Sequence, residues 1–185
     1  MSHPNPPERI PGVDIPVHII ESARRTKTVS AKIIDGVLEV RTPVGMHRGV
    51  RDSHIRDLAK RLKRRQASAE LDLEARAAAL AKRYKLPRPA SITWSSRQNS
   101  RWGSCTPANR TIRISDRLSD MPKWVVDYVI IHELAHLVHP NHGAAFHELV
   151  AQYAKAERAE GFLEAVSLGF ATGTDIPNGE EPLHE

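Results

Sequence analysis

The chain has 185 residues, of which 40% are hydrophobic, so it is long enough and apolar enough to form one ordinary globular domain. Cys105 is its only cysteine, which excludes an internal disulfide and favours a cytoplasmic location. The longest apolar stretch, at 124–138, carries Asp127 and Glu133 as well as two histidines. It is too short and too polar to span a bilayer, so we expect no membrane partner.

The net charge of +5 is unevenly distributed along the chain. Residues 48–65 contain eight Lys or Arg and only two Asp. Such a run is more often a solvated helix face that promotes solubility, although it can also make weak contact with nucleic acid. The sequence leaves both interpretations open.

Composition divides the chain into three parts. Residues 1–12 are rich in Pro and polar side chains and predict a disordered leader. Residues 13–170 predict a single domain, and residues 171–185, which are rich in Gly, Pro and Glu, predict a flexible tail. The domain begins with a β-rich region at 13–47, continues with a helical region at 48–85 and ends with a core region at 86–170.

A β-hairpin is predicted around Asp35 and Gly36, a dipeptide that tolerates the positive φ of a two-residue turn. Folding the chain about this turn places Ile33 opposite Leu38, and Ala31 opposite Val40. The four apolar side chains then share one face, so the turn and the hydrophobic pattern agree on the register.

The segments on either side of the hairpin have different periodicities. Residues 13–21 alternate as a strand does. Apolar residues recur at helical spacing over 50–84, which predicts either one long helix or two helices with a bend. The prolines in 86–89 end this helical region.

Two short strands are predicted in the second half of the chain. Ile92 and Trp94 alternate in one, and Ile112 and Ile114 alternate in the other. We expect these strands to be antiparallel and to be joined by the polar, glycine-containing connection at 95–109.

A buried helix is predicted to follow these strands. Ser119 or Asp120 can cap it, and Pro122 suits its first turn. The helix is apolar almost all round, which is typical of a buried element. It ends near His139, because the residue before a proline avoids the helical region.

This helix carries the pattern H-E-x-x-H at 132–136. Residues i and i+4 of a helix lie about 40° apart around its axis, so His132 and His136 can reach one metal ion from the same side. Glu133 is too far around the helix to be a third ligand, but it can touch a water molecule on that ion. The pattern therefore predicts a hydrolytic zinc site.

An open catalytic zinc site needs three protein ligands. Pro140 stops the helix, so His142 can fold back over its last turn, and imidazole suits zinc. A carboxylate from a final helix predicted at 143–160 is the alternative, and Glu148 and Glu157 are the ones available. We favour His142 because its short tether restricts where its ring can lie.

At such a site, zinc would lower the pKa of its bound water towards about 7 and polarise a scissile carbonyl. Glu133 would take the proton from that water and pass it to the leaving amine. The sequence does not select the group that stabilises the oxyanion. The candidates are Arg101, Tyr128, His147 and Tyr153.

Three segments of the second half also resemble a known family. They are SRWGSC at 100–105, DYVIIHELAH at 127–136, and PNHG at 140–143 followed by Phe146. Together they resemble the YgjP-like zinc metallopeptidases, which are related to the SprT-like and WLM groups. The resemblance implies a zincin-like fold with an edge strand beside the active-site helix. It also implies a catalytic Glu133 and zinc ligands at His132, His136 and His142.

The sequence as a whole predicts an α+β, zincin-like domain whose region at 86–170 is the catalytic core. The principal hypothesis is a zinc-dependent metallopeptidase that acts on a peptide or protein substrate. Two alternatives keep the Zn²⁺ ion. One is a zinc-dependent hydrolase of nucleotides or other phosphoanhydrides, and the other is a non-catalytic zinc-containing module that binds nucleic acid.

Overall fold

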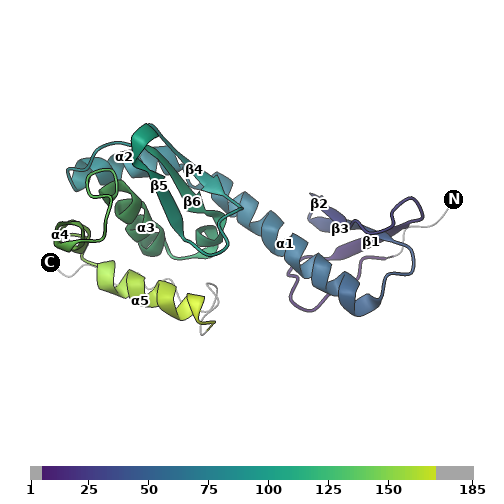
Figure 1. Ribbon diagram of the computed structural model, residues 1–185. Helices are drawn as coiled ribbons and strands as arrows, with labels where there is room; N and C mark the ends of the chain where they lie inside the picture. Colours follow the sequence, from purple (N-terminus) through teal and green to yellow (C-terminus); the bar gives the residue numbers. More distant parts are fainter. Residues whose placement is uncertain (1–5, 170–185) are drawn as a thin grey trace. The chain divides into compact units, whose positions relative to one another are not determined.

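The structure, a computed structural model, describes residues 6–169. Within this range the fold is α+β, as predicted, with two three-stranded sheets and five α-helices (Figure 1). The contacts divide the chain into two compact units, one up to Gln66 and one from Ala67 onward, and each has its own cluster of buried apolar residues. The sequence predicted one domain over 13–170. The tail predicted at 171–185 lies outside the described residues.

The first unit contains the smaller sheet, with the strand order β1-β3-β2. Strand β1 spans Val17–Ser22, β2 spans Ser30–Ile34 and β3 spans Val37–Pro43. Strand β1 runs parallel to β3, and β2 runs antiparallel to it. The strand predicted at 13–21 corresponds to β1, which begins later than expected, at Val17.

The predicted hairpin between β2 and β3 is confirmed. Ile33 lies opposite Leu38 and Ala31 opposite Val40. Asp35 and Gly36 both have positive φ, at 49° and 77°, as a two-residue hairpin turn of this type requires.

Helix α1, Arg48–Glu70, buries Ile55 against the apolar face of this sheet. Part of the predicted disordered leader also packs here. Glu8 forms a β-bridge with Val17, and Ile10 is buried in the same cluster, so the leader prediction is wrong for these residues. Residues 1–5 lie outside the described range.

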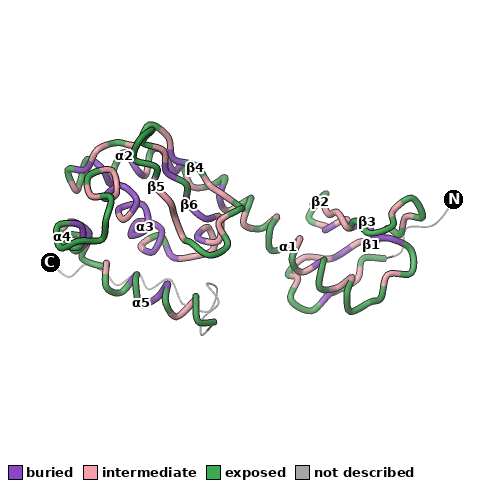
Figure 2. Tube along the Cα trace, in the orientation of Figure 1, coloured by how far each residue is buried: buried purple, intermediate pink, exposed green. Residues whose placement is uncertain are grey.

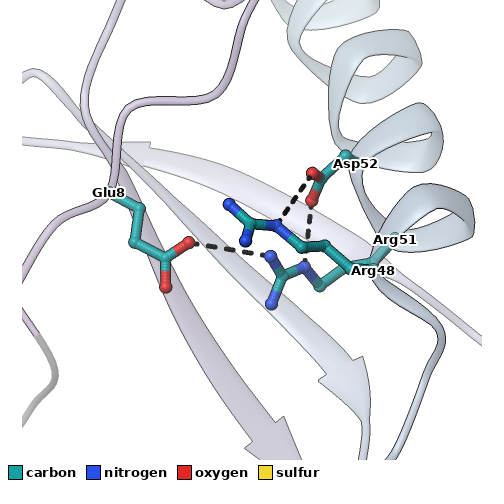
Figure 3. A network of polar contacts seen from close by, with 4 residues as sticks. All are labelled: Glu8, Arg48, Arg51 and Asp52. Atoms are coloured by element: carbon teal, nitrogen blue, oxygen red, sulfur yellow. Dashed lines mark hydrogen bonds and ion pairs between the residues drawn. The ribbon is translucent and has the colours of Figure 1, made fainter.

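Ion pairs join this N-terminal segment to the first turn of α1 (Figure 3). Glu8 contacts Arg51 at 3.6 Å, and Asp52 contacts both Arg51 at 3.1 Å and Arg48 at 3.7 Å. Both cations of the first turn, Arg48 and Arg51, are therefore paired locally, although such partly exposed pairs contribute little to stability.

The helical region predicted at 50–84 consists of two helices. Helix α2, Leu73–Arg83, begins after Asp72, whose side chain accepts a hydrogen bond from the Ala75 backbone N–H at 3.0 Å. This N-cap bond satisfies a donor that would otherwise lack a partner, so it explains why the helix restarts at this position.

The second sheet contains the predicted strands and one more, in the order β4-β6-β5. Strand β4 spans Ser91–Ser95, β5 spans Gly103–Thr106 and β6 spans Thr111–Ser115. The two predicted strands, β4 and β6, are parallel, so the antiparallel prediction for this pair is wrong. The additional strand, β5, lies within the predicted connection at 95–109 and pairs antiparallel with β6 at the sheet edge.

Helix α3, Lys123–Ala135, is the predicted buried helix. It contacts α2, β5 and β6, and its buried residues stand out in Figure 2. Its N-cap is Pro122, and no side chain caps it, so the predicted caps are wrong. Ser119 and Asp120 instead belong to a short 3₁₀ helix that precedes it.

Two helices follow where the sequence predicted one at 143–160. Helix α4 spans Ala144–Ala151 and α5 spans Ala156–Ser167, and both contact α3. Within the described residues, no helix combines the length and the apolarity that a membrane crossing requires.

A charged pair holds α2 against α3. The Arg76 guanidinium donates from Nε to Asp127 Oδ1 at 2.6 Å, and from its Nη2 to Asp127 Oδ2. Asp127 is only 7% exposed, and it lies on the helix that carries the histidine pattern. The pair therefore fixes this helix at a point where a lone carboxylate would be poorly solvated.

We expect Arg76→Met to lower the free energy of unfolding by about 2 kcal/mol, because it leaves the buried Asp127 carboxylate without its partner. Urea denaturation of the purified protein would measure the change. Lys82→Met, on the exposed side of the same helix, should change stability by less than about 0.5 kcal/mol. Equal unfolding midpoints for the two variants would contradict the role given to this pair.

Candidate active site

Three imidazoles converge at the end of α3. His132 lies in the last turn of the helix, His136 is its C-cap residue, and His142 follows in the connection to α4. Their ligand atoms all lie within 4.8 Å of one another, and the Nε2 atoms of His132 and His142 are 3.1 Å apart. Nitrogens bound tetrahedrally to one zinc ion lie about 3.3 Å apart. The three side chains therefore fit a single metal ion of this kind.

The backbone after α3 explains how His142 reaches the other two rings. The N–H groups of Val138 and His139 both donate to the Ala135 carbonyl, which tightens the end of the helix. Pro140 prevents the helix from continuing. The chain then reverses, and the Gly143 N–H donates to the Asn141 carbonyl at 2.9 Å.

The same turn orients the His136 ring. Nδ1 of His136 lies 3.1 Å from the carbonyl oxygen of His139, so this nitrogen must carry the proton and donate it. The lone pair of the ring is then on Nε2. A hydrogen bond of this type to the distal ring nitrogen is the usual way in which proteins orient a metal-ligating histidine.

Phe146, in the first turn of α4, packs against all three imidazoles. Its ring centroid lies 4.8 Å from that of His132, 4.6 Å from that of His136 and 4.7 Å from that of His142. Phe146 is 1% exposed, so it forms a rigid apolar support for the cluster. The sequence places Phe146 among the apolar residues of the final predicted helix and within the family resemblance, but it does not predict this contact with the histidines.

The electrostatics of the cluster favour neutral imidazoles. Burial, together with the smaller effects of the neighbouring His136, His142 and His147, lowers the pKa of His132 to about 4. Burial also lowers the pKa of His136, although the hydrogen bond to the His139 carbonyl opposes this. A neutral imidazole is the form that binds a metal.

Glu133 is the most deeply buried charged residue of the site, at 5% exposure. Burial raises the pKa of its carboxyl group, and although the nearby Arg101 guanidinium opposes this, the pKa is about 8. The Glu133 side chain lies against Gly103 of β5. A Cβ atom at position 103 would overlap the Glu133 carboxyl group and would lie 2.8 Å from its Cγ, so only glycine fits there without a shift.

A cavity of about 980 Å³ opens beside this cluster. One wall is β5 with the residues before it, and another is the face of α3 that carries His132 and Glu133. His136, His142 and part of α5 complete the lining. The site thus brings together a possible metal centre, a buried carboxylate and space for a substrate.

The other predicted residues fall in different places. Arg101 and Tyr128 line the cavity, so both remain candidates for oxyanion stabilisation. Tyr153 does not line it, and its hydroxyl donates to the Trp124 carbonyl at 3.0 Å. His147 stands outside the lining, with its ring 6.3 Å from that of His142.

The two competing carboxylates do not join the cluster. Glu148 and Glu157 are exposed, and neither belongs to the group of converging ligand atoms or to the cavity lining. Sequence reasoning missed two other features of the site. Gly103 was noted only as part of a motif, and the acidic residues of α5 that line the cavity had no recognised pattern.

Comparisons with known proteins point to one family. The family model described as the YgjP-like metallopeptidase domain matches residues 11–160. No curated protein matches the chain.

Two solved structures are similar to part of the chain. The metallopeptidase zymogen abylysin of Pyrococcus abyssi is 19% identical, with a TM-score of 0.46, over 53% of this chain and 94% of that one. The metallopeptidase zymogen jannalysin of Methanocaldococcus jannaschii is 17% identical, with a TM-score of 0.45, over 52% of this chain and 97% of that one.

The contact between Gly103 and Glu133 can be tested through stability. We expect Gly103→Ala to lower the free energy of unfolding by about 2 kcal/mol, because the added methyl group overlaps the buried carboxyl side chain. In a Glu133→Ala background the same change should cost much less, and the difference is the coupling energy of the pair. Urea denaturation of the four proteins would measure it.

Gly161→Ala is the matched control, because a Cβ atom at that exposed helical position meets nothing within 4 Å. It should leave stability unchanged or raise it by up to about 1 kcal/mol. An equal cost of Gly103→Ala with and without the Glu133 side chain would show that the two residues do not interact.

Proposed function

The chain belongs to the YgjP-like family of metallopeptidase domains, and from this premise we propose that it is a zinc peptidase with Glu133 as its catalytic base. We assign the metal to His132, His136 and His142. One observation carries the proposal: three imidazole rings converge beside a buried carboxylate at the wall of a cavity large enough for a peptide segment.

The donor set supports zinc as the metal. Three imidazoles are the ligand set of several catalytic zinc sites, and softer or harder metals prefer thiolates or oxygen donors. Among the described residues, no carboxylate or thiolate joins the three rings. Cys105 lines the cavity, but burial raises the pKa of its thiol to about 11, so it remains protonated near neutral pH. Three protein ligands leave a fourth position for water.

A zinc ion bound there would lower the pKa of a coordinated water molecule to about 7 and would polarise the carbonyl of the scissile bond. Glu133 accepts the proton from the attacking water and then transfers it to the nitrogen of the leaving amine. The close contact with Gly103 restricts where the Glu133 carboxyl group can move, so it stays on the cavity side of α3.

The position of β5 supports an extended peptide as the substrate. Strand β5 is at the edge of its sheet, and Gly103, Ser104 and Cys105 line the cavity. An edge strand presents unpaired backbone groups, to which an extended chain can bind as an additional strand. A substrate bound in this way would be an unstructured peptide or protein segment.

Glu133→Gln should reduce peptide hydrolysis at least about a hundredfold, because an amide cannot accept the proton from water. The variant should still bind one zinc ion, since Glu133 is not a ligand. A fluorogenic peptide assay and metal analysis of the same preparations would measure both. His136→Ala is the comparison variant that should lose the metal as well.

Retained hydrolysis by the zinc-loaded Glu133→Gln protein would contradict the role of this residue. Nucleoside triphosphates assayed in parallel test the alternative substrate class. Turnover of triphosphates without turnover of any peptide would favour phosphoanhydride hydrolysis.

The basic segment supports a further, weaker contact with nucleic acid. Arg48, Arg51 and Lys63 are engaged in ion pairs with nearby acids. By contrast, Lys60, Arg61 and Arg65 are exposed, and they have no ion pair within residues 6–169. They lie on one helix, α1, which could present several cations to a phosphate backbone.

Binding of duplex and single-stranded DNA at rising salt would test this contact. We expect weak affinity that falls as salt rises, and the triple change Lys60→Gln, Arg61→Gln, Arg65→Gln should weaken binding and reduce the salt dependence. The triple change Lys82→Gln, Arg83→Gln, Lys85→Gln is a control that removes the same charge at the end of α2 and just beyond it. Affinity that is independent of salt would exclude phosphate contacts.

A further inference from the structure

One face of α5 forms part of the cavity wall. The lining residues of this helix are Glu160, Leu163, Glu164 and Ser167. Their spacing of three, four and seven residues places them on one side of a helix. Leu163 is buried, whereas the two glutamates keep access to solvent. The wall therefore combines an apolar floor with two carboxylates one helical turn apart.

The fold does not use these two carboxylates in ion pairs. Within residues 6–169, neither Glu160 nor Glu164 has an ion-pair partner. Like charges at positions i and i+4 weakly destabilise a helix, so the pair brings no advantage to folding. Arg101 is the only Lys or Arg in the described lining of the cavity, and Glu133 lines it too. On a chain of net charge +5, this wall is locally acidic.

The acidic wall also lies near the metal cluster. Burial and, to a smaller extent, the charge of Glu160 raise the pKa of Tyr128 to about 12, so Tyr128 and Glu160 are within electrostatic reach of each other. The Tyr128 ring centroid is 6.0 Å from that of His132. Glu133, which is 5% exposed and whose side chain has no hydrogen-bond partner in residues 6–169, lines the same cavity. These observations mark the cavity as a place for a bound ligand.

We propose that Glu160 and Glu164 form a subsite for a Lys or Arg side chain of the substrate, close to the scissile bond. This inference rests on the proposed peptidase function. Leu163 packs against the aliphatic part of the substrate side chain, and the two carboxylates bind its ammonium or guanidinium group. The enzyme then selects basic peptides, although its own net charge repels them at long range.

Matched peptides would test the selectivity. In a fluorogenic peptide of neutral residues, one position at a time is changed to Lys, Gln or Glu on either side of the cleaved bond. At one position, the zinc-loaded enzyme should cleave the Lys peptide with a kcat/KM about tenfold or more above that of the Gln peptide, mainly through KM. Glu at this position should be the worst substrate.

Variants assign that selectivity to α5. Glu160→Gln and Glu164→Gln together should abolish the preference for Lys over Gln, by lowering the kcat/KM ratio of the Lys peptide to the Gln peptide about tenfold, to near one. Glu157→Gln, on an exposed face of the same helix outside the cavity, is the matched control and should retain the preference. A wild-type enzyme that does not discriminate, or a double variant that still does, would overturn the proposal.

A binding measurement separates this inference from the proposed function. In the Glu133→Gln background, fluorescence anisotropy should show tighter binding of the Lys peptide than of the Gln peptide, and the advantage should vanish when Glu160 and Glu164 are changed. If no peptide is cleaved but this preference is present, the peptidase assignment fails and the subsite stands. Equal binding of the two peptides overturns the subsite, whatever the activity.

Discussion

The candidate site depends on the close packing of β5 against α3 at one point. Glu133 is buried in that contact, and a helix carrying a carboxyl side chain can approach a strand so closely only because residue 103 has no side chain. The contact places an edge strand beside the helix that presents His132 and His136. It therefore creates the cavity and positions the carboxylate at the same time. The ion pair between Arg76 and Asp127 holds the same helix against α2.

Parts of the fold with a strong local signal could be predicted from the sequence. The hairpin around Asp35 and Gly36 was correct because turn chemistry and hydrophobic alternation specify the same register. The convergence of His132 and His136 follows from helical spacing alone, and Pro140 explains the return of the chain to His142. These features depend only on residues that are close together in the sequence, so they can be read from the sequence without knowledge of the fold.

Features that depend on tertiary packing were missed. Strand β5 has the sequence Gly-Ser-Cys-Thr, which lacks apolar alternation, and its identity as a strand comes from backbone pairing with β6. The orientation of β4 relative to β6 depends on how the chain crosses between them, which no local pattern records. The separation into two units was hidden because helical periodicity continues through residue 66 in α1. Apolar periodicity also masked the break between α4 and α5.

The hydrogen bond from the His136 ring to the His139 carbonyl links the length of a helix to the chemistry of a ring. That carbonyl is available only because α3 stops where it does. One more turn of helix would direct it along the axis, away from the ring, and the imidazole would be free to rotate or to exchange its proton between nitrogens. Pro140 therefore does more than reverse the chain. By setting where the helix ends, it also determines which nitrogen of His136 is available to a metal.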